Sequence, residues 1–162
     1  MRRDPATWYS YLALGFFTYL LTIQGNILPF LKVELDLSYR VVSLHSAAIA
    51  AGMIAVGLLG DRVVRRWGRR FALALGAAGA ASGAILLCLA PIAWASIASC
   101  ALIGALGALI PAVVPALLAD LHGARRHVAI TEASAASYAF AMLAPLLTSL
   151  RSRSSQAGVL RC

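Results

Sequence analysis

Glu132 attracts attention first, because it is the only carboxylate inside a segment long and apolar enough to cross a membrane. Burying an ionised carboxylate in lipid is costly, so an acid at such a depth is by default a candidate functional site. Glu132 could bind and release a proton. Alternatively, it pairs with nearby Arg126 or extends to the headgroups, which would make its role structural.

Gln24 and Asn26 are polar side chains in an otherwise apolar stretch near the amino terminus, and Thr22 precedes them. At or beyond mid-membrane depth, such groups should face a neighbouring helix or a water-filled cavity rather than lipid. His45 lies a turn into the next apolar stretch, where it either titrates or is a satisfied interfacial histidine.

The richest cluster of ionisable groups is the stretch 57–70, which reads GLLGDRVVRRWGRR. Gly57 and Asp61 are four residues apart and share one face of a helix. The glycine would let a neighbouring helix approach closely, while the carboxylate would sit at the membrane boundary and pair with an arginine. The alternative is a basic loop that only sets topology. Its arginines are Arg62, Arg65, Arg66, Arg69 and Arg70.

Enzymatic chemistry is not indicated, since no nucleophile, base and acid cluster at one depth and no phosphate-binding motif occurs. The three cysteines, Cys88, Cys100 and Cys162, include no CxxC pair, so neither a disulfide framework nor a metal site is expected. We therefore predict a protein that is not an enzyme and that has no cofactor.

The elements that carry these residues must be membrane helices. Hydrophobic residues make up 61% of the chain and charged residues 12%, far from the balance of soluble domains. No Asp, Glu, Lys or Arg occurs in residues 5–31, 41–60, 71–119 or 133–150. Each window can cross a hydrocarbon core, and the third is long enough for two crossings. The net charge of +8 therefore points to lipid headgroups and not to nucleic acid.

We predict an all-α integral membrane protein with about five membrane-spanning helices. Ser38 is a candidate cap for the start of the second helix, and Ala90-Pro91 is the best break within the long third window. The expected spans together form one helical bundle over residues 1–150. They cover about 8–31, 41–60, 71–89, 92–118 and 128–150.

The distribution of Lys and Arg predicts the orientation. With the amino terminus inside, the inner segments hold nine of these residues and the two outer connections hold two, Lys32 and Arg40. We therefore expect a multi-pass protein of the cell (inner) membrane with a cytoplasmic amino terminus. Residues 151–162 form a polar, Ser/Arg-rich tail that is either disordered or the end of a truncated or frameshifted transporter.

The basic stretch resembles the signature between the second and third spans of the major facilitator superfamily. The match consists of Gly-x-x-x-Asp-Arg followed by Gly-Arg-Arg, although five residues, 63–67, separate the two parts, more than in the commonest version. PALLADLHGARR at 115–126 and the approach to Ala144-Pro145 also resemble the amino-terminal half of this superfamily, so the resemblance covers about residues 8–150.

This resemblance implies the fold of the amino-terminal six-helix half, of which the chain would supply five helices. It implies a conformational latch that contacts the opposite half. It also implies that the first and fourth spans line the transport path, which makes Gln24 and Asn26 the substrate-path candidates. The residues of the latch motif are Gly57, Asp61, Arg62, Gly68, Arg69 and Arg70.

The expected function is membrane transport of a small solute by alternating access, with the chain inactive alone. Its expected partners are the lipid bilayer, a small-molecule substrate and either a second transporter half or another copy of itself. The alternative is a small membrane-embedded interaction or assembly protein that transports nothing. A water-accessible cavity at Gln24 and Asn26 would favour transport, whereas burial of both against partner helices would favour assembly.

Overall fold

The structure of the chain, a computed structural model, describes residues 4–34 and 36–159, with the backbone alone for Glu34 and 150–159. Within these ranges all regular elements are helices, which confirms the predicted all-α fold. In chain order the elements are α1 (Pro5–Glu34), α2 (Tyr39–Trp67), α3 (Arg69–Leu89), α4 (Ala93–Gly107), α5 (Leu109–His122), the short 3-10 turn η1 (Gly123–Arg125) and α6 (Arg126–Val159).

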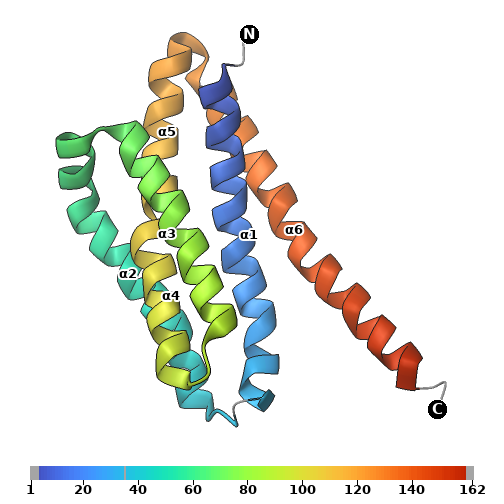
Figure 1. Ribbon diagram of the computed structural model, residues 1–162. Coiled ribbons are helices and arrows are strands. Elements are labelled where there is room, and N and C mark those ends of the chain that lie inside the picture. The colour runs from blue at the N-terminus through green and yellow to red at the C-terminus, as the bar shows by residue number, and fades with distance from the viewer. Residues whose placement is uncertain (1–3, 35, 160–162) are drawn as a thin grey trace.

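Four helical stretches of the described chain are long and apolar enough to cross a membrane. Three of them correspond to α1, α2 and α3, and the fourth extends over 57 residues from Ala93 to Ser149. A straight helix of that length would measure roughly 86 Å, nearly three times the thickness of the hydrocarbon core. This stretch reverses direction at η1, so α4 and α5 run along the bundle one way and α6 returns (Figure 1).

Local sequence signals explain most helix ends. The side chain of Ser38 accepts a hydrogen bond from the amide of Val41 and caps α2, as the sequence predicted. Gly68 separates α2 from α3 with a φ of 84°, a left-handed conformation that glycine adopts without strain. α3 ends at Leu89, immediately before Ala90-Pro91.

Small residues allow close packing of α2, α3 and α4. A Cβ added at Gly52 of α2 would lie 2.4 Å from the backbone nitrogen of Ala105, and one at Gly104 would lie 2.3 Å from the carbonyl oxygen of Ile49. The Gly79 and Gly83 pair of α3 is likewise buried against α4. Close helix approach of this kind gains dispersion contacts that lipid cannot match.

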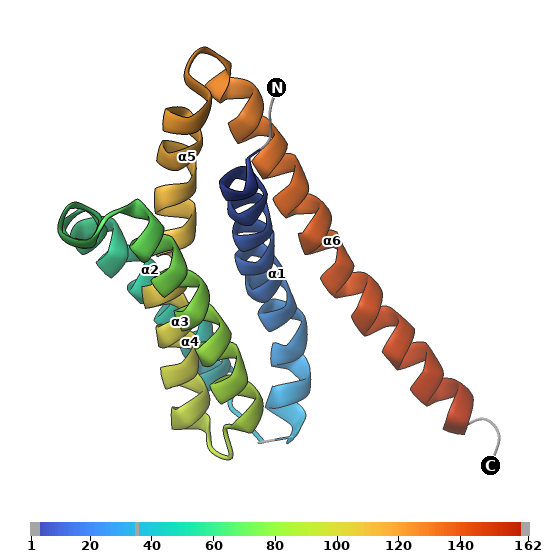
Figure 2. The same ribbon diagram turned by 45° about the horizontal axis from the view of Figure 1, so that its top comes forward.

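α1 packs most extensively against α6, the last helix of the chain. The ring of Phe140 covers Gly15 so closely that a Cβ there would lie 2.7 Å from it. Beyond this contact α6 diverges, and its carboxyl-terminal half lies apart from the other helices in both views (Figures 1 and 2). Met142, Leu143 and Leu146 are exposed on this diverging half.

Several predicted boundaries differ from the helices found. The expected fourth span, 92–118, is divided at Ala108 into α4 and α5. Pro111 in the first turn of α5 lacks the backbone N–H that would continue the ladder of α4, which accounts for the division. The expected polar tail is helical as far as Val159, since Ser, Arg, Gln and Ala all tolerate a helix. Residues 160–162 lie outside the described part of the chain.

Candidate functional site

The basic stretch forms a corner where α2 ends and α3 begins. This corner lies at the same end of the bundle as the start of α1 and the turn between α5 and α6 (Figures 1 and 2). Arg125 and Arg126 occupy that turn, whereas Lys32 and Arg40 lie at the opposite end. Among the residues whose side chains the structure describes, positive charge is therefore concentrated at the end of the bundle where α1 begins.

Asp61 pairs with Arg65, one turn further along α2, at 2.9 Å. Both side chains are about 70% exposed, at 68% and 73%, so the pair contributes little to stability. The sequence placed Asp61 near the loop arginines without fixing its partner. The pair follows from the ordinary i, i+4 spacing on a helix.

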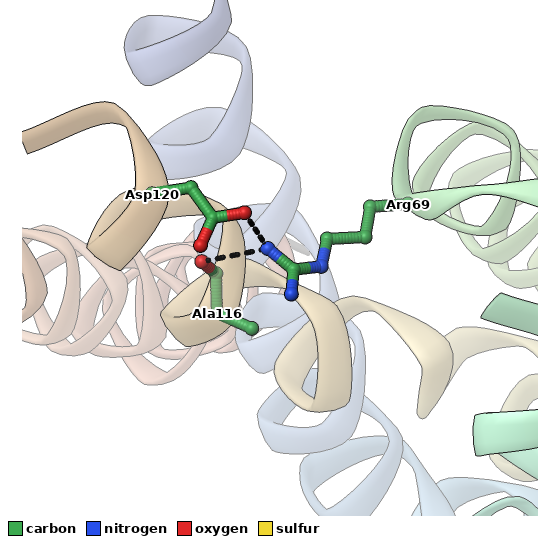
Figure 3. A network of polar contacts seen from close by, with 3 residues as sticks. All are labelled: Arg69, Ala116 and Asp120. Carbon is green, nitrogen blue, oxygen red and sulfur yellow. Dashed lines mark hydrogen bonds and ion pairs between the residues drawn. The ribbon is translucent and has the colours of Figure 1, made fainter. Parts of the chain in front are cut away.

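Arg69 joins the start of α3 to α5. Its guanidinium donates to the carbonyl oxygen of Ala116 at 3.2 Å and forms an ion pair with the carboxylate of Asp120 (Figure 3). Asp120 was not among the predicted site residues. Its signal in the sequence was its position at the end of an apolar run, opposite a basic loop on the same side of the membrane.

A groove of about 310 Å³ lies between α2 and α5 beside this corner. Gly57, Gly60 and Asp61 contribute one side, and Leu109, Ala112, Val113 and Ala116 line the other, with Arg69 at the end. A Cβ added at Gly57 would meet nothing within 4 Å, so this glycine leaves open space. The lining of the groove is thus mostly apolar, with one carboxylate, Asp61, and one guanidinium, Arg69.

The groove brings together half of the predicted latch motif. Gly57, Asp61 and Arg69 line it. Arg62, Gly68 and Arg70 are exposed at the corner and are absent from the lining.

The two substrate-path candidates differ in their surroundings. Gln24 is 8% exposed, and its side-chain amide donates to the sulfur of Cys100 on α4 at 3.9 Å. The side-chain nitrogen of Asn26 is buried and has no hydrogen-bond partner among the described residues. Gln24 therefore connects two helices in this structure, while Asn26 retains a donor with nothing to bind.

Glu132 accepts a hydrogen bond from the hydroxyl of Tyr11 at 3.0 Å, which connects α6 to α1. One turn earlier on α1, the hydroxyl of Thr7 lies 3.1 Å from Nε2 of His122, at the end of α5. Sequence reasoning missed both contacts, because their partners are 121 and 115 residues apart. Together they tie the start of α1 to α5 and α6.

His45 is fully buried between α2 and α4. Its Nδ1 lies 2.9 Å from the carbonyl oxygen of Val41 and must donate to it, while Nε2 lies 2.8 Å from the hydroxyl of Ser96. This histidine is thus satisfied on both nitrogens. Among residues 4–34 and 36–159, no group of three or more His, Cys, Asp or Glu side chains is arranged to hold a metal ion.

The described helices form a bundle with four stretches long and apolar enough to cross a membrane, and with a cluster of arginines between α2 and α3. The chain belongs to the Major Facilitator Superfamily, whose sequence profile matches residues 10–154. Members of this family are generally transporters and not enzymes.

A curated relative is the multidrug efflux pump LfrA of Mycolicibacterium smegmatis, strain ATCC 700084 / mc(2)155. The two sequences are 28% identical in an alignment of 155 residues that covers 91% of this chain. The chain spans only 28% of the length of that relative. No solved structure matches the chain.

Proposed function

We propose that this chain forms one wall of a solute carrier that works by alternating access, and that the groove between α2 and α5 receives a helix of the opposite wall. The observation that carries this proposal is the groove itself, which is apolar along its floor and open beside Gly57. A small residue at that point lets a further helix approach α2 closely.

The ionic groups at the mouth of the groove suit the start of a docking helix. The carboxylate of Asp61 is exposed, and a helix amino terminus favours a nearby anion. In this proposal the pair of Asp61 with Arg65 opens when the incoming helix takes the carboxylate. Arg62, Gly68, Arg69 and Arg70 complete the latch by shaping the corner and by holding α3 to α5.

The relative's name supports drug-like small molecules, moved outward, as the substrate class. The unpartnered donor of Asn26 and the buried amide of Gln24 are the proposed substrate contacts on α1. Glu132 is the proposed proton site. When Glu132 carries a negative charge, its hydrogen bond from Tyr11 is charge-assisted, so adding a proton would weaken the contact between α6 and α1.

We place the chain in the cell membrane with its amino terminus in the cytoplasm. The five corner arginines together with Arg125 and Arg126 lie at the end of the bundle where α1 begins, and the positive-inside rule favours that end on the cytoplasmic side.

Transport is proposed to require helices beyond those of this chain, since the chain spans 28% of its relative. This requirement is tested by measuring ethidium flux into proteoliposomes across which a proton gradient is imposed. We expect no dye flux above protein-free liposomes from the chain alone. Co-expression with the remaining helices of the relative, as a separate polypeptide, should produce flux.

Gly57→Leu, which fills the groove, should abolish that flux, and Ala55→Leu is the matched control because Ala55 is exposed on α2 outside the groove. Equal flux from the chain alone would show that no further helices are needed, and full flux with Gly57→Leu would show that the groove is not a docking site.

A second candidate function is assembly without transport, favoured by the hydrogen bond between Gln24 and Cys100. In that case Gln24 and Asn26 only hold helices together. Single cysteines at positions 24 and 26, in a background without the native cysteines, distinguish the two functions. Labelling by a membrane-impermeant maleimide indicates a wet transport path, whereas protection at both positions indicates assembly.

A further inference from the structure

The corner between α2 and α3 carries positive charge that the protein does not neutralise. Asp61 pairs with Arg65, and Asp120 pairs with Arg69. Among the described residues, the other three arginines of the corner, Arg62, Arg66 and Arg70, have no acidic partner, and all three are exposed.

Two aromatic rings accompany these arginines. Trp67 and Phe71 pack edge to face with ring centroids 5.1 Å apart, and both are about half exposed. The guanidinium of Arg66 lies 6.0 Å from the centre of the Trp67 ring. Amphipathic aromatic rings next to arginine are typical of the level at which lipid headgroups meet the hydrocarbon. We call Arg62, Arg66, Trp67, Arg70 and Phe71 the basic corner.

The position of the basic corner along α2 fits the same level. A helix of 29 residues is about 44 Å long, which exceeds the roughly 30 Å hydrocarbon core, so one end of α2 must extend into the headgroups. Just before the arginines, Ile54 and Leu58 are 65% and 75% exposed, as lipid-facing residues would be. The corner also projects from the side of the bundle, where lipid can reach it (Figures 1 and 2).

Among the residues with described side chains, the opposite end of the bundle offers no such surface. The cations with described side chains at that end are Lys32, which lies 3.8 Å from the centre of the Tyr39 ring, and Arg40. Glu34 and Asp36 balance these two charges in the sequence. Over the part of the chain whose side chains are described, the unbalanced cations are thus concentrated at one end of the bundle.

We propose that the basic corner binds the headgroup of an anionic phospholipid in the leaflet that it contacts. Guanidinium groups pair with phosphate through two parallel hydrogen bonds, and Trp67 and Phe71 would pack beside the glycerol and upper acyl chain. A nucleic acid, an acidic protein and an anionic lipid would all complement this charge. The exposed apolar residues next to the corner place it at the membrane surface, which favours the lipid. This inference does not depend on transport.

Purified chain in a neutral detergent, titrated with phosphatidylglycerol or phosphatidylcholine and followed by native mass spectrometry, tests the proposal. A triple variant should bind phosphatidylglycerol more weakly, on the order of tenfold to a hundredfold. It combines Arg62→Gln, Arg66→Gln and Arg70→Gln. The control combines Arg40→Gln, Arg125→Gln and Arg126→Gln, which remove the same charge from exposed positions elsewhere, and should change binding little. An equal loss of phosphatidylglycerol affinity in both triple variants would overturn the proposal. So would equal affinity of the unchanged protein for the two lipids.

A second measurement does not depend on those variants folding. In a Trp8→Phe, Trp94→Phe background, Trp67 is the single tryptophan. Phosphatidylglycerol with brominated acyl chains should quench its fluorescence at lower lipid concentration than brominated phosphatidylcholine. The difference should shrink as salt rises from 50 to 200 mM, because salt screens exposed charges. Identical quenching by the two lipids would refute a headgroup site at the basic corner.

Discussion

Gly52 is one of two described glycines, with Gly104, at which neighbouring backbone leaves no room for a side chain. A Cβ there would lie 2.4 Å from the nitrogen of Ala105 and 2.8 Å from the carbonyl oxygen of Ala101, and backbone atoms cannot move aside cheaply. Gly52→Ala should therefore lower the free energy of unfolding by about 1–3 kcal/mol. Thermal unfolding in detergent, followed by circular dichroism, measures the change.

Gly57→Ala is the matched control for that substitution, because it lies on the same helix and its Cβ would meet nothing within 4 Å. It should leave the unfolding midpoint unchanged or raise it slightly, since alanine restricts the unfolded chain. If both alanine variants unfolded alike, α2 and α4 would not be packed as described.

Tyr11 provides a second test at the residue scale. Tyr11→Phe removes the hydroxyl that donates to Glu132 and should destabilise the α1 and α6 contact by about 0.5–1.5 kcal/mol. Tyr9→Phe is the control, because Tyr9 is 46% exposed. In a double-mutant cycle with Glu132→Gln, a coupling energy of zero would mean that the two side chains do not interact.

The same residues show how far sequence reasoning reaches within a site. The pair of Asp61 with Arg65 needs only helical spacing, so a partner among the loop arginines was predictable. Arg69 and Asp120 are 51 residues apart and meet only because α3 packs beside α5. Spacing along the chain carries no information about such a contact, so Asp120 was missed.

At the scale of elements, helix ends set by local chemistry were predictable and the division of the fourth span was not. Ser38 and Ala90-Pro91 act on their immediate neighbours, and the structure places helix ends there. Pro111 falls inside the expected span 92–118, but Pro115 lies inside α5 without ending it, so a proline alone did not predict where this span divides. The absence of charge from 92 to 118 also favoured one uninterrupted helix over that part of the chain.

Pro111→Ala tests the origin of this division. Alanine restores a backbone N–H that can donate to the carbonyl oxygen of Gly107, so α4 and α5 should join into one helix. Hydrogen exchange of the amides at 108–112, measured by mass spectrometry, should slow. Pro115→Ala, one turn further along α5, should leave exchange at 108–112 unchanged. Faster exchange in Pro111→Ala would mean that the proline stabilises the junction.

At the scale of the whole molecule, the testable property is which end faces the cytoplasm. A single cysteine at Ala124 in η1, in a background without native cysteines, should react with a membrane-impermeant maleimide only after cells are permeabilised. The native Cys88, exposed near the opposite end of α3, should react in intact cells when it is the only cysteine. The reverse pattern would invert the proposed orientation.

The pairing of the first helix with the last has a consequence for how the protein is made. A ribosome adds about 5–20 residues per second, so roughly 6–24 seconds separate the synthesis of α1 from that of the α6 residues it packs against. During that delay the face of α1 around Gly15, which Phe140 later covers, must contact lipid or the insertion machinery. Until α6 is made, α1 must therefore be held by contacts other than its final ones, and a slowed or stalled ribosome would lengthen that period.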